Sequence, residues 1–200
     1  MIKRVLLVAA FVLSLVLLIG CEVDPPEEPN DEPEYGMGQV DQPLPIDGTN
    51  EGYPTDPLEV AGSLIYLAHD DDYMYVYAEA EVEGWLAVGF NESGSGMDGS
   101  NMVLGYYDDG NPVYRDDVGV GNTHSEAGVT AVNEFYFNRT EGVTIMEFSY
   151  PMVFPDGEGY NVEQILPGES YSLIVGMHAS SDDITTMHTN FGMTDFQIQP

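Results

Sequence analysis

Met97 is the first residue of the chain with an evident chemical use. It lies in the glycine- and serine-rich stretch 91–100 and directly follows Gly96, so the backbone around it can adopt conformations that other residues reach only with strain. The stretch joins two short apolar segments, residues 85–90 and 102–106, which we expect to be strands. A thioether in such a loop either covers an apolar surface or acts as a ligand.

The four histidines are the other candidates for ligation. His69 precedes a run of aspartates and His124 lies among Gly, Asn and Ser, so we expect both to be solvated surface residues. His188 lies in a polar stretch just before the last predicted strand. His178 ends the predicted strand 171–178 and is the alternative to His188 as a pocket residue.

No catalytic constellation is recognisable in the chain. There is no serine nucleophile elbow, no His-Glu-x-x-His and no phosphate-binding loop. Acidic pairs such as Asp116/Asp117 lack the alternate-residue spacing of a calcium loop, which favours solvated turns. We therefore expect a non-catalytic redox or binding module rather than an enzyme.

The composition excludes one class of partner. The 200 residues include 35 Asp or Glu and only 4 Lys or Arg, which gives a formal net charge of -31 at pH 7. Nucleic acid is not an expected partner, because phosphate binding needs clustered cations. The hydrophobic content of 43%, with 13 Tyr and 8 Phe, is nevertheless that of a folded protein.

The N-terminus has the features of an export signal. Lys3 and Arg4 precede the apolar run 5–19, and the tetrapeptide Leu-Ile-Gly-Cys ends at Cys21, the one cysteine of the chain. This tetrapeptide resembles the lipobox of prokaryotic lipoproteins, so residues 1–20 are predicted to be a lipoprotein signal peptide and Cys21 the lipidated residue. An uncleaved anchor helix is the alternative. Either way we expect the protein at the cell envelope, on the extracytoplasmic side of a membrane.

Residues 21–57 are predicted to be an acidic, proline-rich linker. The segment has no apolar periodicity, and its prolines and mutually repelling carboxylates favour an extended chain. We expect it to hold the folded part away from the membrane without packing on it. Residues 58–200 then form one domain.

Apolar residues in this domain recur with the period of a strand. Residues 73–82 and 144–150 alternate apolar and polar side chains, and no window after the signal shows a helical stripe. This pattern predicts an all-β, antiparallel, immunoglobulin-like β-sandwich. The further predicted strands are 64–68, 113–116, 129–138, 171–178 and 194–198.

Several of these segments together resemble the DOMON domain. They are the tyrosine-rich strand 73–80, Gly-Trp-Leu-Ala-Val-Gly-Phe at 84–90, Met97, Gly-Ser-Asn-Met-Val-Leu-Gly-Tyr at 99–106, and His-Thr-Asn-Phe-Gly at 188–192. The resemblance covers about residues 58–200. Members commonly have Asp before the second Met of the motif, where this chain has Asn101.

The resemblance implies a β-sandwich with an end cavity, which in many members holds a b-type heme between a Met and a His. Met97 and His188 are then the expected axial ligands of a heme b, with Trp85, Gly96 and Met102 beside the cofactor. A thioether and an imidazole suit electron transfer, and the absence of Cys-x-x-Cys-His excludes covalent attachment.

Two other readings of the same residues stay open. Trp85 is equally suited to be the central packing residue of a sandwich. Some members of the family are proposed to hold a sugar in the cavity, so a carbohydrate or small ligand is the alternative to heme. A redox protein or small electron carrier is the expected partner in the first case.

Overall fold

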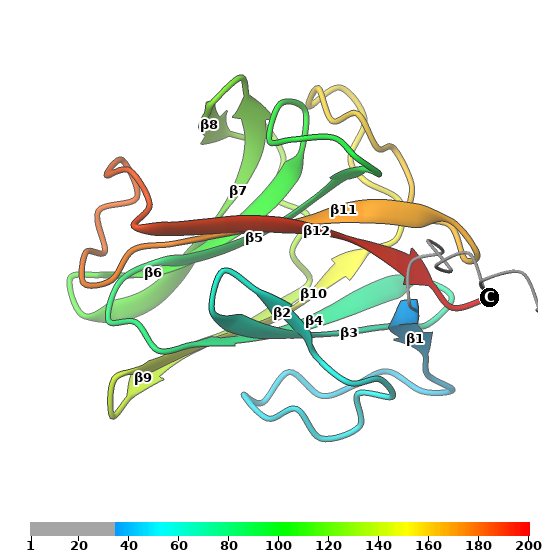
Figure 1. The fold of residues 1–200 in the computed structure, drawn as a ribbon, viewed down its shortest axis with the longest axis horizontal. Coiled ribbons are helices and arrows are strands. Elements are labelled where there is room, and N and C mark those ends of the chain that lie inside the picture. The colour runs from blue at the N-terminus through cyan, green and yellow to red at the C-terminus, as the bar shows by residue number, and fades with distance from the viewer. Residues whose placement is uncertain (1–34) are drawn as a thin grey trace, which may run out of the picture. The chain divides into compact units, whose positions relative to one another are not determined.

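The computed structural model describes residues 35–200, and the regular secondary structure of this part consists of β-strands alone (Figure 1). The strands are β1 (Tyr35–Gln39), β2 (Leu58–Val60), β3 (Ser63–His69), β4 (Tyr73–Ala80), β5 (Leu86–Glu92), β6 (Asn101–Asp108), β7 (Asn111–Val120), β8 (Thr123–Glu126), β9 (Glu134–Thr140), β10 (Val143–Pro151), β11 (Ser170–Met177) and β12 (Asn190–Ile198).

All twelve strands belong to one hydrogen-bonded sheet, in the order β8-β7-β6-β5-β11-β12-β1-β3-β4-β10-β9, with β2 paired to β3. The sheet curls into two layers, which Figure 1 shows one above the other. Tyr114 of β7 packs against Phe135 of β9 with ring centroids 4.8 Å apart, so the two arms of the sheet meet again on the far side. The fold is therefore all-β and sandwich-like, as predicted.

The prediction of a purely antiparallel sheet is wrong at one strand. β1 pairs in parallel with both β12 and β3, whereas all other pairings are antiparallel. β1 joins the two layers by filling the gap between them. A strand in that place satisfies the edges of both neighbours, which otherwise present unpaired backbone groups.

The predicted linker is also too long at its C-terminal end. Met37 of β1 is fully buried in the core. Farther along, the buried carboxylate of Glu147 on β10 accepts hydrogen bonds from the Asp47 and Gly48 backbone nitrogens at 2.8 and 2.6 Å and from the Tyr53 hydroxyl at 3.2 Å. Residues 35–57 therefore pack as part of the domain, held by a polar anchor that apolar periodicity does not reveal.

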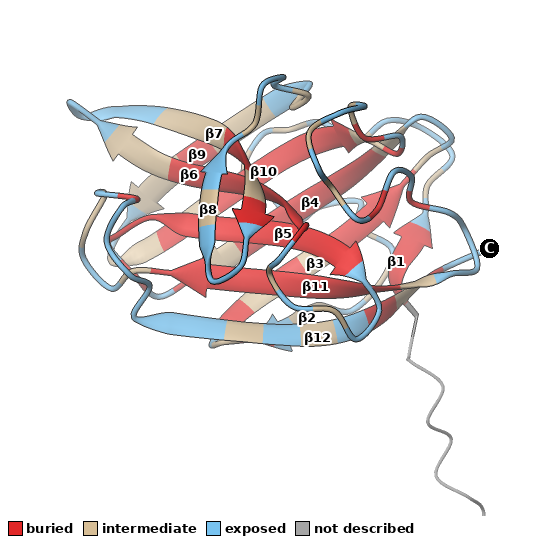
Figure 2. Cartoon of the chain, turned by 90° about the horizontal axis from the view of Figure 1, so that it is seen from above, coloured by how far each residue is buried: buried red, intermediate tan, exposed pale blue. Residues whose placement is uncertain are grey.

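The main core lies between the two layers. Alternate residues of β4, β5, β10 and β11 point into it, and Figure 2 shows the central strands buried along most of their length. The largest fully buried side chains there include Phe90, Phe148, Tyr150 and Phe196. Burial of such aromatic side chains is the main source of the stability of a fold of this kind.

Two strand predictions fail in detail near β8. The predicted strand 129–138 begins only at Glu134, where β9 pairs with β10. Residues 123–126 were not expected to form a strand, yet β8 pairs with β7 across the turn at Gly121, which has a φ of 60°. The Gly-Asn pair at this turn is the hairpin signal that the strand assignment overlooked.

The predicted signal peptide, Cys21 and residues 21–34 of the predicted linker lie outside the described residues. Within residues 35–200, the structure has no helix of the length and apolarity needed to cross a membrane.

Two buried carboxyls make the stability of the domain dependent on pH. Burial raises the pKa of Glu147 from 4.5 to about 7 and that of Asp116 from 3.8 to about 6. At a pH between the ordinary pKa of such a carboxyl and its raised pKa, the folded protein binds more protons than the unfolded chain. We therefore expect the free energy of unfolding to fall as pH rises from about 4 to about 7.

Denaturant unfolding at pH 5 and pH 7 measures this fall. Glu147→Gln should reduce it by on the order of 1 kcal/mol, since one of the two titrating groups is gone. Exposed Glu81→Gln changes the net charge equally and should leave the fall unchanged. An equal fall in unfolding free energy in the Glu147→Gln variant and the unmodified protein would contradict the raised pKa of Glu147.

Candidate functional site

A large cavity lies on the outer face of the layer formed by β6, β5, β11 and β12. Its volume is about 830 Å³. The floor consists of the residues that alternate with the core-facing ones on these strands, among them Ala87, Gly89, Met102, Ile174 and Gly176. The predicted cavity at an end of the sandwich is therefore wrong in position, because both faces of these strands are apolar and the second face carries the pocket.

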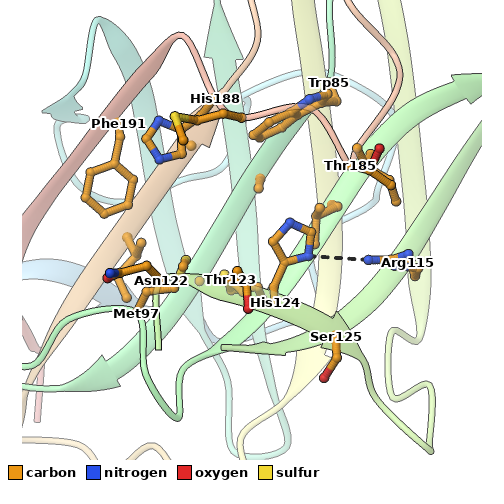
Figure 3. Close-up of a pocket in the computed structure, with 18 of the residues that line it drawn as sticks. Trp85, Met97, Arg115, Asn122, Thr123, His124, Ser125, Thr185, His188 and Phe191 are labelled. Carbon is orange, nitrogen blue, oxygen red and sulfur yellow. Dashed lines mark hydrogen bonds between the residues drawn. The ribbon is translucent and has the colours of Figure 1, made fainter. Parts of the chain in front are cut away.

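Three chain segments wall this pocket. They are the loop that carries Met97, the β7–β8 hairpin around Asn122, and the segment between β11 and β12 that carries His188. In the view of Figure 3, His188 and Trp85 lie on one side of the pocket and Met97 and Asn122 on the other. The structure thus brings the two predicted ligands to one cavity from segments 91 residues apart in the sequence.

The Met97 loop is held by side-chain bonds to its carbonyls. The fully buried Asn91 donates from Nδ2 to Gly96 O at 2.6 Å and to Asp98 O at 3.0 Å. Ser100 donates from Oγ to Met97 O at 2.7 Å. These bonds give the glycine-rich loop one backbone shape, so the Met97 side chain is presented from a fixed position.

The same loop packs closely on β7. Gly99 N donates to Gly119 O at 2.9 Å, and a Cβ built on Gly119 would lie only 1.7 Å from Met97 O. No side chain fits between the two segments, so glycine at position 119 is a steric requirement of the loop.

His188 lies over the floor at the other side of the pocket. Its ring stacks on Phe191 with centroids 4.9 Å apart and planes 24° apart. A Cβ at Gly176 would lie 4.0 Å from His188 Cβ and 3.5 Å from the Trp85 ring, so Gly176 keeps the floor low between these two residues.

Arg139 of β9 anchors the segment that leads to His188. Its guanidinium donates to Asp182 at 2.8 and 3.2 Å and to Gly84 O at 2.9 Å, and it lies 5.1 Å from the centroid of the Tyr107 ring. The remaining arginine of the described residues, Arg115, lies in the pocket itself.

His178, the alternative to His188, does not line the pocket. Its Nδ1 accepts hydrogen bonds from Ser180 N at 3.2 Å and Ser181 N at 2.8 Å, which closes a turn after β11. Among the two candidates, the geometry therefore favours His188.

The expectations for the other two histidines are wrong. His69 is 1% exposed and its ring nitrogens pair with the Asp70 and Gln199 carbonyls, so it ties β3 to the C-terminal segment. His124 lines the pocket and pairs with the buried Asp117. Both errors arise because neighbouring Asp, Gly and Asn residues suggested turns, whereas each histidine lies in a paired strand.

The polar side of the pocket is built from β7 and β8. Asp117 accepts hydrogen bonds from Arg115 Nε and Nη2 and from His124 Nδ1. Burial alone would raise the pKa of Asp117, but these two partners outweigh it and hold the pKa below its usual range. Residues 115 and 117 are two positions apart on β7 and therefore share one face of the strand. This spacing is the sequence signal for the cluster once the β7–β8 hairpin, which carries His124, is recognised.

Trp85, Gly96 and Met102 all line the pocket. Trp85 is 4% exposed and packs with Ala87, Met102 and other residues of a small outer cluster, separate from the main core. Its indole therefore forms a wall of the pocket rather than the centre of the sandwich. Its buried Nε1 has no hydrogen-bond partner among the described residues.

Comparison with protein-family models gives a match to the DOMON domain over residues 65–178, more than half of the chain. The chain belongs to the DOMON domain family. A search of curated proteins gives no match.

Cytochrome domains and carbohydrate-binding modules are among the solved structures similar to this DOMON domain. The cytochrome domain of Myriococcum thermophilum cellobiose dehydrogenase is 14% identical, with a TM-score of 0.52 over 75% of this chain and 80% of that one. A family 9 carbohydrate-binding module from Caldicellulosiruptor kristjanssonii, in complex with cellotriose, is 10% identical, with a TM-score of 0.52 over 83% and 94%. The cytochrome b domain of Coprinopsis cinerea pyranose dehydrogenase is 12% identical, with a TM-score of 0.47 over 62% and 67%.

Asn101, the departure from the usual DOMON motif, lies outside the pocket. It is fully buried, and its Nδ2 donates to the Tyr150 hydroxyl at 2.7 Å across the core. The substitution therefore affects the interior between the layers. Within residues 35–200 no three His, Cys, Asp or Glu side chains are grouped to hold a metal ion.

The close approach of Gly119 to Met97 O provides a test of how the loop is positioned. Gly119→Ala should displace the Met97 loop and destabilise the protein by about 1–3 kcal/mol, the cost of overpacking. Hydrogen exchange at the Ser100 amide, which donates to Met97 O, should become faster. Gly96→Ala is the control, because no atom lies within 4 Å of the added Cβ; equal effects of the two variants would show that the contact is not critical.

Proposed function

We propose that this protein is a b-type heme module that passes single electrons. The proposed location is the extracytoplasmic side of a membrane, with a lipid on Cys21 as the anchor. The observation that supports the proposal most strongly is that Met97 and His188 line one cavity, on the frame of a family to which the chain belongs.

The residues of the pocket fit a heme. Its volume of about 830 Å³ lies within the range of about 300–1,000 Å³ usual for ligand pockets. The floor is apolar, and Gly176 leaves room between the Trp85 ring and His188. Met97 and His188 would hold the iron, with Trp85 and Met102 against the macrocycle.

A heme with a thioether and an imidazole ligand would supply a one-electron carrier of raised reduction potential. With both axial positions filled by the protein, no position is left for a substrate. The chain's own contribution is to keep Met97 and His188 in place through the loop bonds of Asn91 and the Arg139 anchor.

The structural neighbours and the charge are consistent with this function. One neighbour is the cytochrome domain of a cellobiose dehydrogenase. The net charge of -31 favours a basic electron-transfer partner, because opposite charge steers the encounter of two proteins.

A heme-free carbohydrate-binding role is the second candidate. The fold is equally similar to a carbohydrate-binding module in complex with cellotriose. The lining of this pocket contains the hydroxyl and amide side chains of Asn122, Thr123, Ser125 and Thr185 as well as the Trp85 indole, a combination suited to a sugar. Retention of heme-free protein on a polysaccharide column would favour this candidate.

An absorption spectrum of the full chain, purified and mixed with hemin, tests the heme proposal. On reduction we expect the sharp split bands of a six-coordinate, low-spin heme. Met97→Ala and His188→Ala should each convert the spectrum to a five-coordinate or high-spin form, because each removes one axial ligand. A protein that stays colourless after incubation with hemin would end the proposal.

His178→Ala is the matched control for these variants. It removes an imidazole that lies outside the pocket lining, so the low-spin bands should persist. Loss of the bands in His178→Ala, with retention in His188→Ala, would reverse the choice between the two histidines.

A further inference from the structure

The pocket has a cationic edge in a protein that is otherwise strongly acidic. Arg115 and Arg139 are the two Lys or Arg residues of the described part of the chain. Arg139 is engaged with Asp182 and Gly84 behind the pocket, whereas Arg115 lies in the lining beside His124.

Asp117 fixes the orientation of this pair. Its side chain is fully buried and accepts bonds from Arg115 Nε, Arg115 Nη2 and His124 Nδ1. Arg115 Nη2 also lies 3.3 Å from His124 Nδ1, and within residues 35–200 Arg115 Nη1 and His124 Nε2 take part in no hydrogen bond. In Figure 3 the His124 ring lies inside the pocket between its two sides.

The opposite part of the pocket is apolar. Met97, Met102 and Leu104 belong to the outer cluster that forms the floor, while Thr123 and Ser125 flank His124 on β8. A ligand that matches both parts has a flat or extended apolar body with an anionic group at one edge. Glu126 also lies in the lining and is exposed.

We propose that Arg115 and His124 bind a carboxylate of the pocket's ligand. Arg115 Nη1 donates to one carboxylate oxygen and His124 pairs with the same carboxylate through Nε2, with Asp117 as the fixed counter-charge behind both. The inference deepens the proposed function, since heme carries two propionates. An acidic sugar such as a uronate offers the same group, and the two sources are separated by experiment.

The test compares each acid with its methyl ester. Binding of hemin and hemin dimethyl ester to the purified full chain is measured by absorption, and binding of trigalacturonate and its methyl ester by calorimetry. The unmodified protein should bind one of the two acids more tightly than its ester by about tenfold or more, the ratio expected for a charge-assisted hydrogen bond.

Two variants locate the preference. His124→Gln and the double variant Arg115→Gln/Asp117→Asn should bring the acid-to-ester ratio close to one, and the double variant does so without leaving a buried carboxylate unpaired. His178→Gln, which changes an imidazole outside the pocket lining, should retain the full ratio. Because the affinities for acid and ester are compared within one variant, a general loss of folded protein lowers both and leaves their ratio unchanged.

The outcomes separate this inference from the heme proposal. Acid preference for hemin supports both, and acid preference for trigalacturonate in a protein that does not bind hemin supports the carboxylate site while ending the heme proposal. Hemin binding with the same affinity as its ester, with no acid preference for trigalacturonate, overturns the carboxylate site and leaves the heme proposal standing. An acid preference that persists in both variants, or the absence of any acid preference, also overturns it.

Discussion

The central constraint of this fold is that β5, β6 and β11 are apolar on both faces. One face, with Leu86 and Val175, closes the main core between the layers. The other, with Ala87 and Met102, has no second layer of sheet to cover it. An apolar surface of this kind must be covered by loops or by a ligand. Three segments rise around it and leave a pocket in the middle, which makes the site a direct consequence of the sheet.

Most of the polar residues buried near this pocket act to position backbone. Asn91 holds the Met97 loop, Arg139 with Asp182 holds the segment leading to His188, and Asp117 holds the Arg115 and His124 side chains. Asn91 and Asp117 are fully buried, so their hydrogen bonds are strong because they are shielded from water, whereas Arg139 and Asp182 are partly exposed. The loops are rich in glycine, yet these bonds give them defined shapes, and a pre-shaped pocket loses less entropy when a ligand binds.

Sequence reasoning succeeded where a local pattern carries the information. Alternation of apolar residues predicts the all-β fold. The resemblance to the DOMON domain pairs the glycine-flanked Met97 with His188, and this pairing predicts which loops line one pocket. It failed where the information is not local. The parallel strand around Met37 depends on partners about 30 and 160 residues away, and the anchoring of residues 47–53 depends on Glu147, about 100 residues away. His124 was dismissed because its hairpin was not recognised, and with it the cationic edge of the pocket.

The claim on which this account depends is that the Met97 sulfur and a His188 nitrogen ligate one metal centre in the outer-face pocket. X-ray absorption at the iron edge of hemin-loaded protein tests it most directly, with a second sample grown with selenomethionine. We predict one sulfur neighbour beside the nitrogen shell of iron, replaced by selenium in the labelled sample and lost in Met97→Ala. An iron shell of nitrogen and oxygen alone, unchanged by the label, would contradict the account.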